Sequence, residues 1–390
     1  MPWKELNVME LRTQFIAEWL AKRYTVTALS QRYGISRQTA HKWIGRFKRD
    51  GFKGLTDRST APHHRPQRTP AMIREQIIAS KLLHQHWGPK KVVDYLKRHQ
   101  PKLQWPADST VGEILKQAGL VKARNKRKRV GADVAVFKDC DRCNRVWSVD
   151  YKGQFVLGNG RLCYPLTVTD NYSRYLLQCR ALASPNHRDT RSWLEWVFRE
   201  YGLPQAIRSD NGAPFASMAA GGISRLSRWW IQLGIKPERI KPGKPQHNGR
   251  HERMHRTLKA EATRPAAYSL EAQQKRFDAF CREYNDERSH ESLERKCPVQ
   301  VYQPSPQTYP ERVPEVEYEQ QVQVRSVRHN GQIKWKGEFI YVTEILAKDR
   351  VGLTEIDNDL WEVRYGFYLL GFIPERTMKL ERAKAWHGHL

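Results

Sequence analysis

Apolar positions in the first fifty residues recur at helical spacing. Residues 10–49 are expected to form three short helices, with Leu29, Ala40 and Trp43 on the inward faces. Gly34 permits a tight turn, and Ser36 is a good N-cap for the helix that follows it. This pattern predicts a helix-turn-helix unit over 1–55, although a helical hairpin that serves only as protein scaffold would show the same spacing.

The second helix of a helix-turn-helix unit reads the major groove of DNA through its first residues. The candidate contacts to bases and phosphates are therefore the polar residues that open this helix, Arg37, Gln38, His41 and Lys42.

A second helical unit is predicted over 71–121, after a basic, proline-rich linker at 56–70. Its expected helices are Ala71–His86, Pro89–His99 and Ser109–Ala118, the last capped by Asp108 and ended by Gly119. The short third helix favours another helix-turn-helix or a winged helix.

The pattern changes to alternating apolar and polar residues from Arg145 onward. Strands are predicted at Val146–Tyr151, Leu162–Thr169, Tyr175–Ala181 and Ala206–Ser209. Helices are predicted at Asp189–Tyr201, at Ser224–Leu233 and from about Asn248 to Ala262. Three strands in a meander, followed by helix, strand and helices, indicate an α/β domain over 138–303.

Short apolar runs separated by tight turns return near the end of the chain. After a linker at 304–317, residues 318–385 contain strand-like segments around Asn330-Gly331, Lys336-Gly337 and Asp357-Asn358. Together with an aromatic core, these segments predict a small β-barrel.

The charge balance indicates a partner. The 390 residues, enough for roughly two to four domains, carry a formal net charge of +27. Such an excess of basic residues is typical of proteins that bind a polyanion such as double-stranded DNA. The densest stretch lies within 122–137, where a DNA-binding strap is expected, with a nuclear-localisation signal as the alternative. Its candidate contacts are Lys122, Arg124, Lys126, Arg127, Lys128 and Arg129.

The sequence contains no apolar stretch of membrane-spanning length and no secretory segment near Met1. Six scattered cysteines suggest reduced thiols. Cys140 and Cys143 form a Cys-x-x-Cys pair, and the sequence contains no second pair of this kind that could complete a zinc site. The expected compartment is the cytoplasm, and a zinc site is not expected.

Three carboxylates stand in settings suited to a metal ion. Asp150 and Asp210 follow strand-like runs, and Glu252 opens a helix among arginines. Two divalent ions, Mg²⁺ or Mn²⁺, held by such carboxylates could activate an attacking hydroxyl and stabilise a leaving oxygen at phosphorus. Arg256 and Lys259 share the helix face of Glu252 and are expected to contact DNA, although a Glu–Arg ion pair within the helix is the simpler interpretation.

The motifs around these acids resemble those of a known family. Trp147-Ser-Val-Asp-Tyr-Lys-Gly153, Ser209-Asp-Asn-Gly-Ala-Pro-Phe215 and Pro245-Gln-His-Asn-Gly-Arg-His-Glu-Arg-Met-His-Arg-Thr-Leu-Lys259 resemble the integrase core of bacterial insertion-sequence transposases, members of the retroviral-integrase-like DDE superfamily. Tyr284-Asn-Asp-Glu-Arg-Ser-His-Glu-Ser-Leu293 adds to the likeness. The separation of Asp210 from Glu252 is longer than is usual in that family, and 216–224 is the expected insertion.

The resemblance implies a multidomain fold: α-helical helix-turn-helix units, a ribonuclease-H-like α/β catalytic core with a mixed sheet, and a C-terminal SH3-like barrel. It implies that Asp150, Asp210 and Glu252 are the catalytic, metal-binding triad, with two Mg²⁺ or Mn²⁺ ions per site. Asp170 is instead expected to stabilise a turn.

The expected function is a DNA transposase that binds terminal inverted repeats, frees 3′-hydroxyl ends and joins them to target DNA. The partners are transposon-end and target duplexes in a homodimer or larger synaptic assembly, without membrane or ATP, since no Gly-x-x-x-x-Gly-Lys-Ser/Thr loop is present. A regulator that binds DNA without catalysis and a nuclease that cuts without joining remain alternatives.

Overall fold

The structure is a computed structural model that describes residues 7–58, 69–121, 140–240 and 249–382. Contacts divide the chain between Thr69 and Pro70 into two compact units. The predicted basic strap at 122–137 and most of the 56–70 linker lie outside the described residues.

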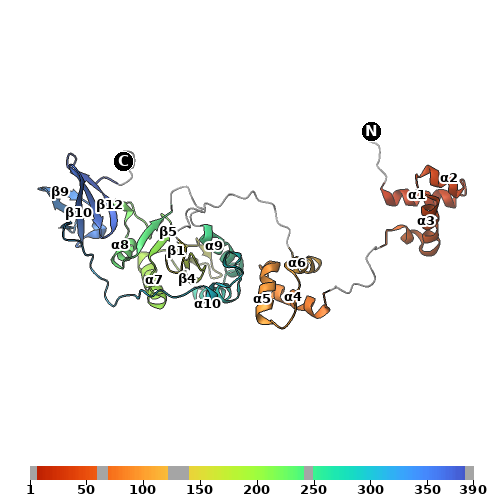
Figure 1. Cartoon of the computed structure of the whole chain (residues 1–390), viewed down its shortest axis with the longest axis horizontal. Coiled ribbons are helices and arrows are strands. Elements are labelled where there is room, and N and C mark those ends of the chain that lie inside the picture. Colours follow the sequence, from red (N-terminus) through yellow and green to blue (C-terminus); the bar gives the residue numbers. More distant parts are fainter. Residues whose placement is uncertain (1–6, 59–68, 122–139, 241–248, 383–390) are drawn as a thin grey trace. The chain divides into compact units, whose positions relative to one another are not determined.

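The first unit contains the three predicted helices (Figure 1), which are α1 (Val8–Leu20), α2 (Val26–Arg32) and α3 (Arg37–Asp50). The 3₁₀ helix η1 (Gly51–Leu55) follows. Ser36 caps α3 by accepting a hydrogen bond from Thr39 N, and Gly34 has a φ of 62°, as the predicted turn requires. Leu29, Ala40 and Trp43 lie in its core.

The second unit begins with another three helices, α4 (Ala71–Leu83), α5 (Pro89–His99) and α6 (Asp108–Gln117). They pack around Trp87, which is 1% exposed. The prediction that Asp108 caps α6 was wrong, because Ala107 occupies the N-cap position and makes no side-chain cap. The Asp108 carboxylate instead accepts hydrogen bonds from the Arg295 guanidinium, so a distant ion pair replaced the local cap.

The α/β domain is built on a mixed sheet with strand order β2-β3-β1-β5-β6, in which β4 pairs with β3. Its strands are β1 (Val146–Tyr151), β2 (Phe155–Val156), β3 (Leu162–Asp170), β4 (Leu176–Leu182), β5 (Ala206–Ser209) and β6 (Lys236–Arg239). The three pairings of β3, with β1, β2 and β4, are antiparallel, whereas β1, β5 and β6 run parallel to one another. The sequence predicted β1, β3, β4 and β5 to within a residue, but it missed β2 and β6.

Helices cover both faces of this sheet (Figure 1). On one face, α7 (His187–Tyr201) and α8 (Arg225–Gln232) share a core with Trp147, Val149, Leu166 and Val168. On the other face lie α9 (Gly249–Ala262) and α10 (Leu270–Arg282), with Cys163 and Cys179 of the sheet. The sequence did not predict α10.

A segment after α10 holds the α4–α6 unit against the α/β domain. It comprises the π-helical turn η5 (Glu283–Glu287) and the 3₁₀ turns η6 (Glu291–Leu293) and η7 (Pro298–Gln300). Arg295 pairs with Asp94 of α5 at 2.7 Å, and Ser289 Oγ donates to the same carboxylate at 2.6 Å. Asp94 is buried, so these bonds replace the hydrogen bonds to water that its carboxylate loses on folding.

The C-terminal region is rich in β-structure, as predicted. A four-stranded antiparallel sheet has the order β12-β11-β10-β7, and β8 and β9 form a hairpin. The strands are β7 (Gln323–Ser326), β8 (Gln332–Trp335), β9 (Glu338–Tyr341), β10 (Arg350–Asp357), β11 (Leu360–Tyr365) and β12 (Tyr368–Pro374), with η8 (Glu344–Leu346) between β9 and β10. Ile231 of α8 lies in its core, and Arg228 of α8 forms an ion pair with Asp349. The two domains are therefore packed together.

Candidate metal centre and nucleic-acid-binding surfaces

The two predicted aspartates stand at the same edge of the sheet. Strands β1 and β5 are parallel, and their register places Val149 opposite Ser209. Asp150 and Asp210 are the next residues of these two segments, so the pairing brings them to the carboxyl ends of neighbouring strands. Side chains alternate along β1, and Trp147 and Val149 enter the α7–α8 core. Asp150 consequently points to the face that α9 covers.

The charges of the other two predicted acids act on Asp150. Burial, followed by the nearby charge of Asp210, raises the pKa of Asp150 from 3.8 to about 7. The charge of Glu252 raises this pKa further, whereas the backbone of Tyr151 and the charge of Lys152 lower it. A carboxylate that is costly to ionise for these reasons is stabilised by a divalent cation, so the residues fit a metal ion.

The loop that carries Asp210 is shaped around its carboxylate. Gly212 N donates to Asp210 Oδ1 at 3.1 Å, and a Cβ on Gly212 would lie 3.0 Å from Asp210 Oδ2. The glycine of the Asp-Asn-Gly sequence thus permits the loop to fold closely over the acid. Asn211 Nδ2 donates to the carbonyl of Ile240, which ties the loop to the end of β6.

Glu252 lies in the first turn of α9, where the helix dipole favours a negative charge. Its side chain is exposed, as are those of Arg256 and Lys259 further along the predicted stripe. Lys259 lowers the pKa of Lys152, after the larger effect of burial, so these two cations lie near one another. The sequence missed Lys152, although it stands two residues after Asp150.

Two buried histidines of α9, His251 and His255, lie beside Asp150, and no role was predicted for them from the sequence. Thr167 is directly opposite Asp150 in the β1–β3 register, and its Oγ1 lies 2.7 Å from Nε2 of both His251 and His255. Thr167 also donates to the Asp150 carbonyl at 3.0 Å, and Thr169 Oγ1 lies 2.8 Å from His251 Nδ1.

Ligand-type atoms of Asp150, His251 and His255 all lie within 4.8 Å of one another. Burial lowers the pKa of His251 to about 3 and that of His255 still further. The signal for these residues was the His-x-x-x-His spacing around Glu252, which places both rings on the inner face of α9.

Asp170 has the structural role that the sequence predicted. It is buried at the end of β3, where it accepts hydrogen bonds from Ser173 N, Ser173 Oγ and Asn144 N. These three bonds hold the turn into β4.

The predicted DNA contacts of α3 are available to a partner. Arg37, Gln38, His41 and Lys42 are all exposed, whereas Ala40 and Trp43 of the same helix are buried. The Lys42 ammonium lies 5.2 Å from the centroid of the Trp43 ring. The helix therefore presents one polar surface from its N-terminal end, as a groove-reading helix requires. The other predicted cations, Lys122 to Arg129, lie outside the described residues.

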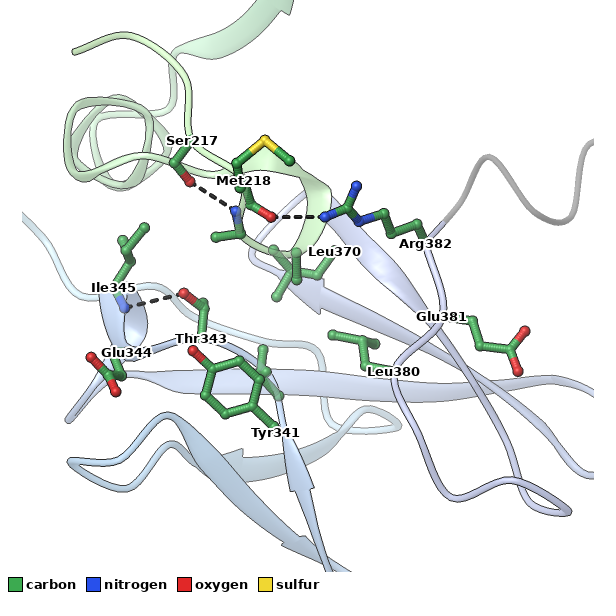
Figure 2. A pocket seen from close by; sticks show the side chains of 13 residues that line it. Ser217, Met218, Tyr341, Thr343, Glu344, Ile345, Leu370, Leu380, Glu381 and Arg382 are labelled. Atoms are coloured by element: carbon green, nitrogen blue, oxygen red, sulfur yellow. Dashed lines mark hydrogen bonds between the residues drawn. The ribbon is translucent and has the colours of Figure 1, made fainter. Parts of the chain in front are cut away.

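A cavity of about 550 Å³ lies between the 216–224 loop and the C-terminal strands (Figure 2). Ser217 and Met218 line one side, and Tyr341, Thr343 and Glu344 line the other. Arg382 donates to the Met218 carbonyl at 2.9 Å across it. None of the three candidate metal ligands lines this cavity, and the predicted insertion serves here as a contact between domains.

No helix among the described residues is long and apolar enough to cross a membrane.

The chain matches four domain families. Integrase core domains match residues 141–245 and 233–298. A helix-turn-helix domain matches 12–63, and a homeodomain-like domain matches 39–115. These matches identify the chain as a protein that combines helix-turn-helix domains with an integrase core.

Similar curated proteins come from bacterial insertion elements and retroviruses. The insertion element IS476 uncharacterized 39.2 kDa protein of Xanthomonas euvesicatoria is 26% identical over 72% of this chain and 79% of its own length. The insertion element IS407 uncharacterized 31.7 kDa protein of Burkholderia multivorans is 27% identical over 47% of this chain and 65% of its own length. The Gag-Pol polyprotein of baboon endogenous virus is 33% identical over 26% of this chain and 6% of that protein.

Among solved structures, the catalytic core domain of HTLV-2 integrase in complex with magnesium covers 42% of this chain and 98% of its own, at 16% identity and a TM-score of 0.33. The domain matches and the insertion-element relatives support a bacterial insertion-sequence transposase of the integrase-like superfamily.

Proposed function

We propose that this protein is a DNA transposase that binds the terminal inverted repeats of its element, hydrolyses a phosphodiester at each end and joins the freed 3′-hydroxyls to target DNA. The observation that carries the proposal is the β1–β5 register, which brings Asp150 and Asp210 to the carboxyl ends of neighbouring strands. The raised pKa of Asp150, caused by burial and by the charges of Asp210 and Glu252, supports it. Carboxylates that lie together in a protein of net charge +27 are suited to bind a divalent cation that also binds a substrate phosphate.

Asp150, Asp210 and Glu252 are the proposed catalytic residues and would hold Mg²⁺ or Mn²⁺, two ions per site. When bound, these ions would lower the pKa of an attacking hydroxyl and stabilise the charge on the leaving oxygen. The sheet positions Asp150 and Asp210, and the first turn of α9 supplies Glu252. The protein thereby orients the acids before DNA arrives.

Exposed cations would position the DNA. Arg256 and Lys259 continue the face of Glu252, so they are proposed to bind phosphates next to the scissile bond. Arg37, Gln38, His41 and Lys42 of α3 are proposed to read the element ends, and the Lys122–Arg129 stretch to neutralise the backbone. The C-terminal strands are proposed to form an SH3-like barrel that contacts DNA and neighbouring subunits.

Joining two ends in one event requires both ends to be held together. The proposed working form is therefore a homodimer or a larger synaptic assembly with two duplex ends and target DNA. Domains are proposed at 1–55, 71–121, 138–303 and 318–385, connected by 56–70, 122–137 and 304–317.

The test is an assay with the full chain, end-sequence DNA, Mg²⁺ and a target plasmid. The wild-type protein is expected to give joined products, whereas cleavage alone would favour a nuclease and binding alone a regulator. Asp210→Asn is expected to bind end DNA normally and to give neither cleavage nor joining. Glu200→Gln, an exposed acid on α7, is the matched control and should retain joining. Joining by Asp210→Asn would remove Asp210 from the mechanism.

A further inference from the structure

The hydrogen bonds around Thr167 determine where the protons of two buried histidines lie. Thr167 has one hydroxyl proton, and the Asp150 carbonyl can only accept, so that proton is donated to it at 3.0 Å. The oxygen of Thr167 must then accept from Nε2 of both His251 and His255. For neutral rings, no other arrangement satisfies all these contacts.

The two rings differ in what remains at Nδ1. His251 Nδ1 accepts from the Thr169 hydroxyl, so both of its nitrogens are engaged. His255 donates through Nε2, which leaves a lone pair on Nδ1, and this atom lies 3.9 Å from Asp150 Oδ2. A nitrogen lone pair beside an ionised carboxylate oxygen is repulsive, and a cation bound between the two atoms removes that repulsion.

The separation fits a shared ion. Oxygen and imidazole nitrogen ligands lie roughly 2.0–2.1 Å from small divalent ions, so two ligands of one ion can be at most about 4.2 Å apart. The 3.9 Å between His255 Nδ1 and Asp150 Oδ2 falls within this limit. His255 is 7% exposed and is held at its other nitrogen, so little side-chain freedom would be lost on binding.

We propose that His255 Nδ1 is a direct ligand of the metal ion that Asp150 holds, and that the site is therefore a mixed carboxylate–imidazole site. The inference rests on the proposed function for the presence of the ion and adds a ligand to it. Imidazole suits transition metals, whereas Mg²⁺ prefers oxygen ligands. His255 consequently favours Mn²⁺ over Mg²⁺ at this position.

The test measures Mn²⁺ bound to the full-length protein without DNA, by electron spin echo envelope modulation, which detects a coordinated imidazole nitrogen. Wild-type protein is expected to show nitrogen coupling that changes when its histidines carry ¹⁵N. His255→Gln keeps an amide N–H near the position of Nε2 but removes Nδ1, so it should lose the coupling. Its affinity for Mn²⁺ should fall at least about tenfold.

His251→Gln is the matched control, because it makes the same change one turn earlier, and it should retain the coupling. His255→Asn places an oxygen near the position of Nδ1, so it should lose the nitrogen coupling while its preference shifts toward Mg²⁺. The isotope experiment uses the unaltered protein and decides the question even where a variant fails to fold.

Failure of this inference is distinguishable from failure of the proposed function. Loss of Mn²⁺ binding in Asp150→Asn, with no nitrogen coupling in the wild type or with coupling that persists in His255→Gln, would overturn the His255 assignment alone. That result would leave His255 as a positioning residue or as a protonated partner of Asp150. Unchanged Mn²⁺ binding in Asp150→Asn would overturn the metal centre itself.

Discussion

The hydroxyl of Thr167, on β3, lies 2.7 Å from Nε2 of His255, on α9. The same hydroxyl donates to the main chain of Asp150, on the neighbouring strand β1. One buried oxygen therefore connects the strand that carries one candidate metal ligand with the helix that carries another, Glu252. The spacing of these acids depends on a polar contact inside the domain as well as on the sheet.

Replacing Thr167 with valine is expected to weaken this connection. The change removes the oxygen but keeps the shape of the side chain, so the Nε2–H groups of His251 and His255 lose their acceptor. Leaving two buried donors unsatisfied should lower the free energy of unfolding by about 2–4 kcal/mol, measured by urea denaturation. The Mg²⁺ concentration for half-maximal cleavage should also rise.

Thr167→Ser is the control, because it retains the hydroxyl and should keep the wild-type Mg²⁺ requirement. Equal behaviour of the valine and serine variants would show that the hydroxyl does not connect α9 to the sheet.

The raised pKa of Asp150 predicts how the stability of the metal-free protein depends on pH. Its pKa is about 7 in the folded protein and near 3.8 in the unfolded chain, so the folded form binds the extra proton between these values. The stability contributed by this proton is complete below about pH 4 and is lost as the pH rises through about 7. The loss is up to about 4 kcal/mol at 1.36 kcal/mol per pKa unit.

Thermal unfolding of the metal-free protein between pH 5 and pH 8 checks this, in steps of about half a unit. Asp150→Asn should flatten that part of the profile, and Mg²⁺ should stabilise the wild type most at the alkaline end. A decline of the same size in Asp150→Asn would assign the effect to other groups.

The sheet edge and its acids could be predicted from the sequence because the signals are local. Alternating apolar residues located β1 and β5, and each is followed directly by its aspartate. The short strand β6 could not be found in this way, since Lys236–Arg239 contains a proline and three charged residues and becomes a strand only by pairing with β5. The contact between the histidines of α9 and Thr167 could not be predicted either, because Thr167 is far from them in sequence.

Docking of the second helical unit also depends on a distant contact. Asp108 looked like a helix cap from its neighbours, but Arg295 binds it together with Asp94. Helix propensity cannot predict this, because the ion pair forms between segments that only the folded chain brings together.

Replacing Arg295 with methionine is expected to loosen the attachment of α5 to the 283–296 segment. Asp94 is buried and would keep only the hydrogen bond from Ser289, so the free energy of unfolding should fall by about 1–3 kcal/mol. Hydrogen exchange should show faster exchange of the α5 amides than in the wild type. Lys90→Met removes the exposed ion pair with Glu291 and should leave this exchange unchanged. Equal protection of α5 in the Arg295 variant would contradict the docking role.

The exposed cations of α9 should be visible in the salt dependence of DNA binding. If Arg256 and Lys259 each neutralise one phosphate, the double change Arg256→Gln and Lys259→Gln should reduce the slope of log K against log salt by about 1.8. Titrations of end-sequence duplex at several salt concentrations measure this slope. Arg276→Gln with Lys275→Gln removes the same charge from exposed positions of α10 and should leave the slope unchanged. A similar reduction in both double variants would mean that net charge, and not the α9 face, governs binding, whereas a reduction confined to the α9 pair would place duplex DNA beside Glu252.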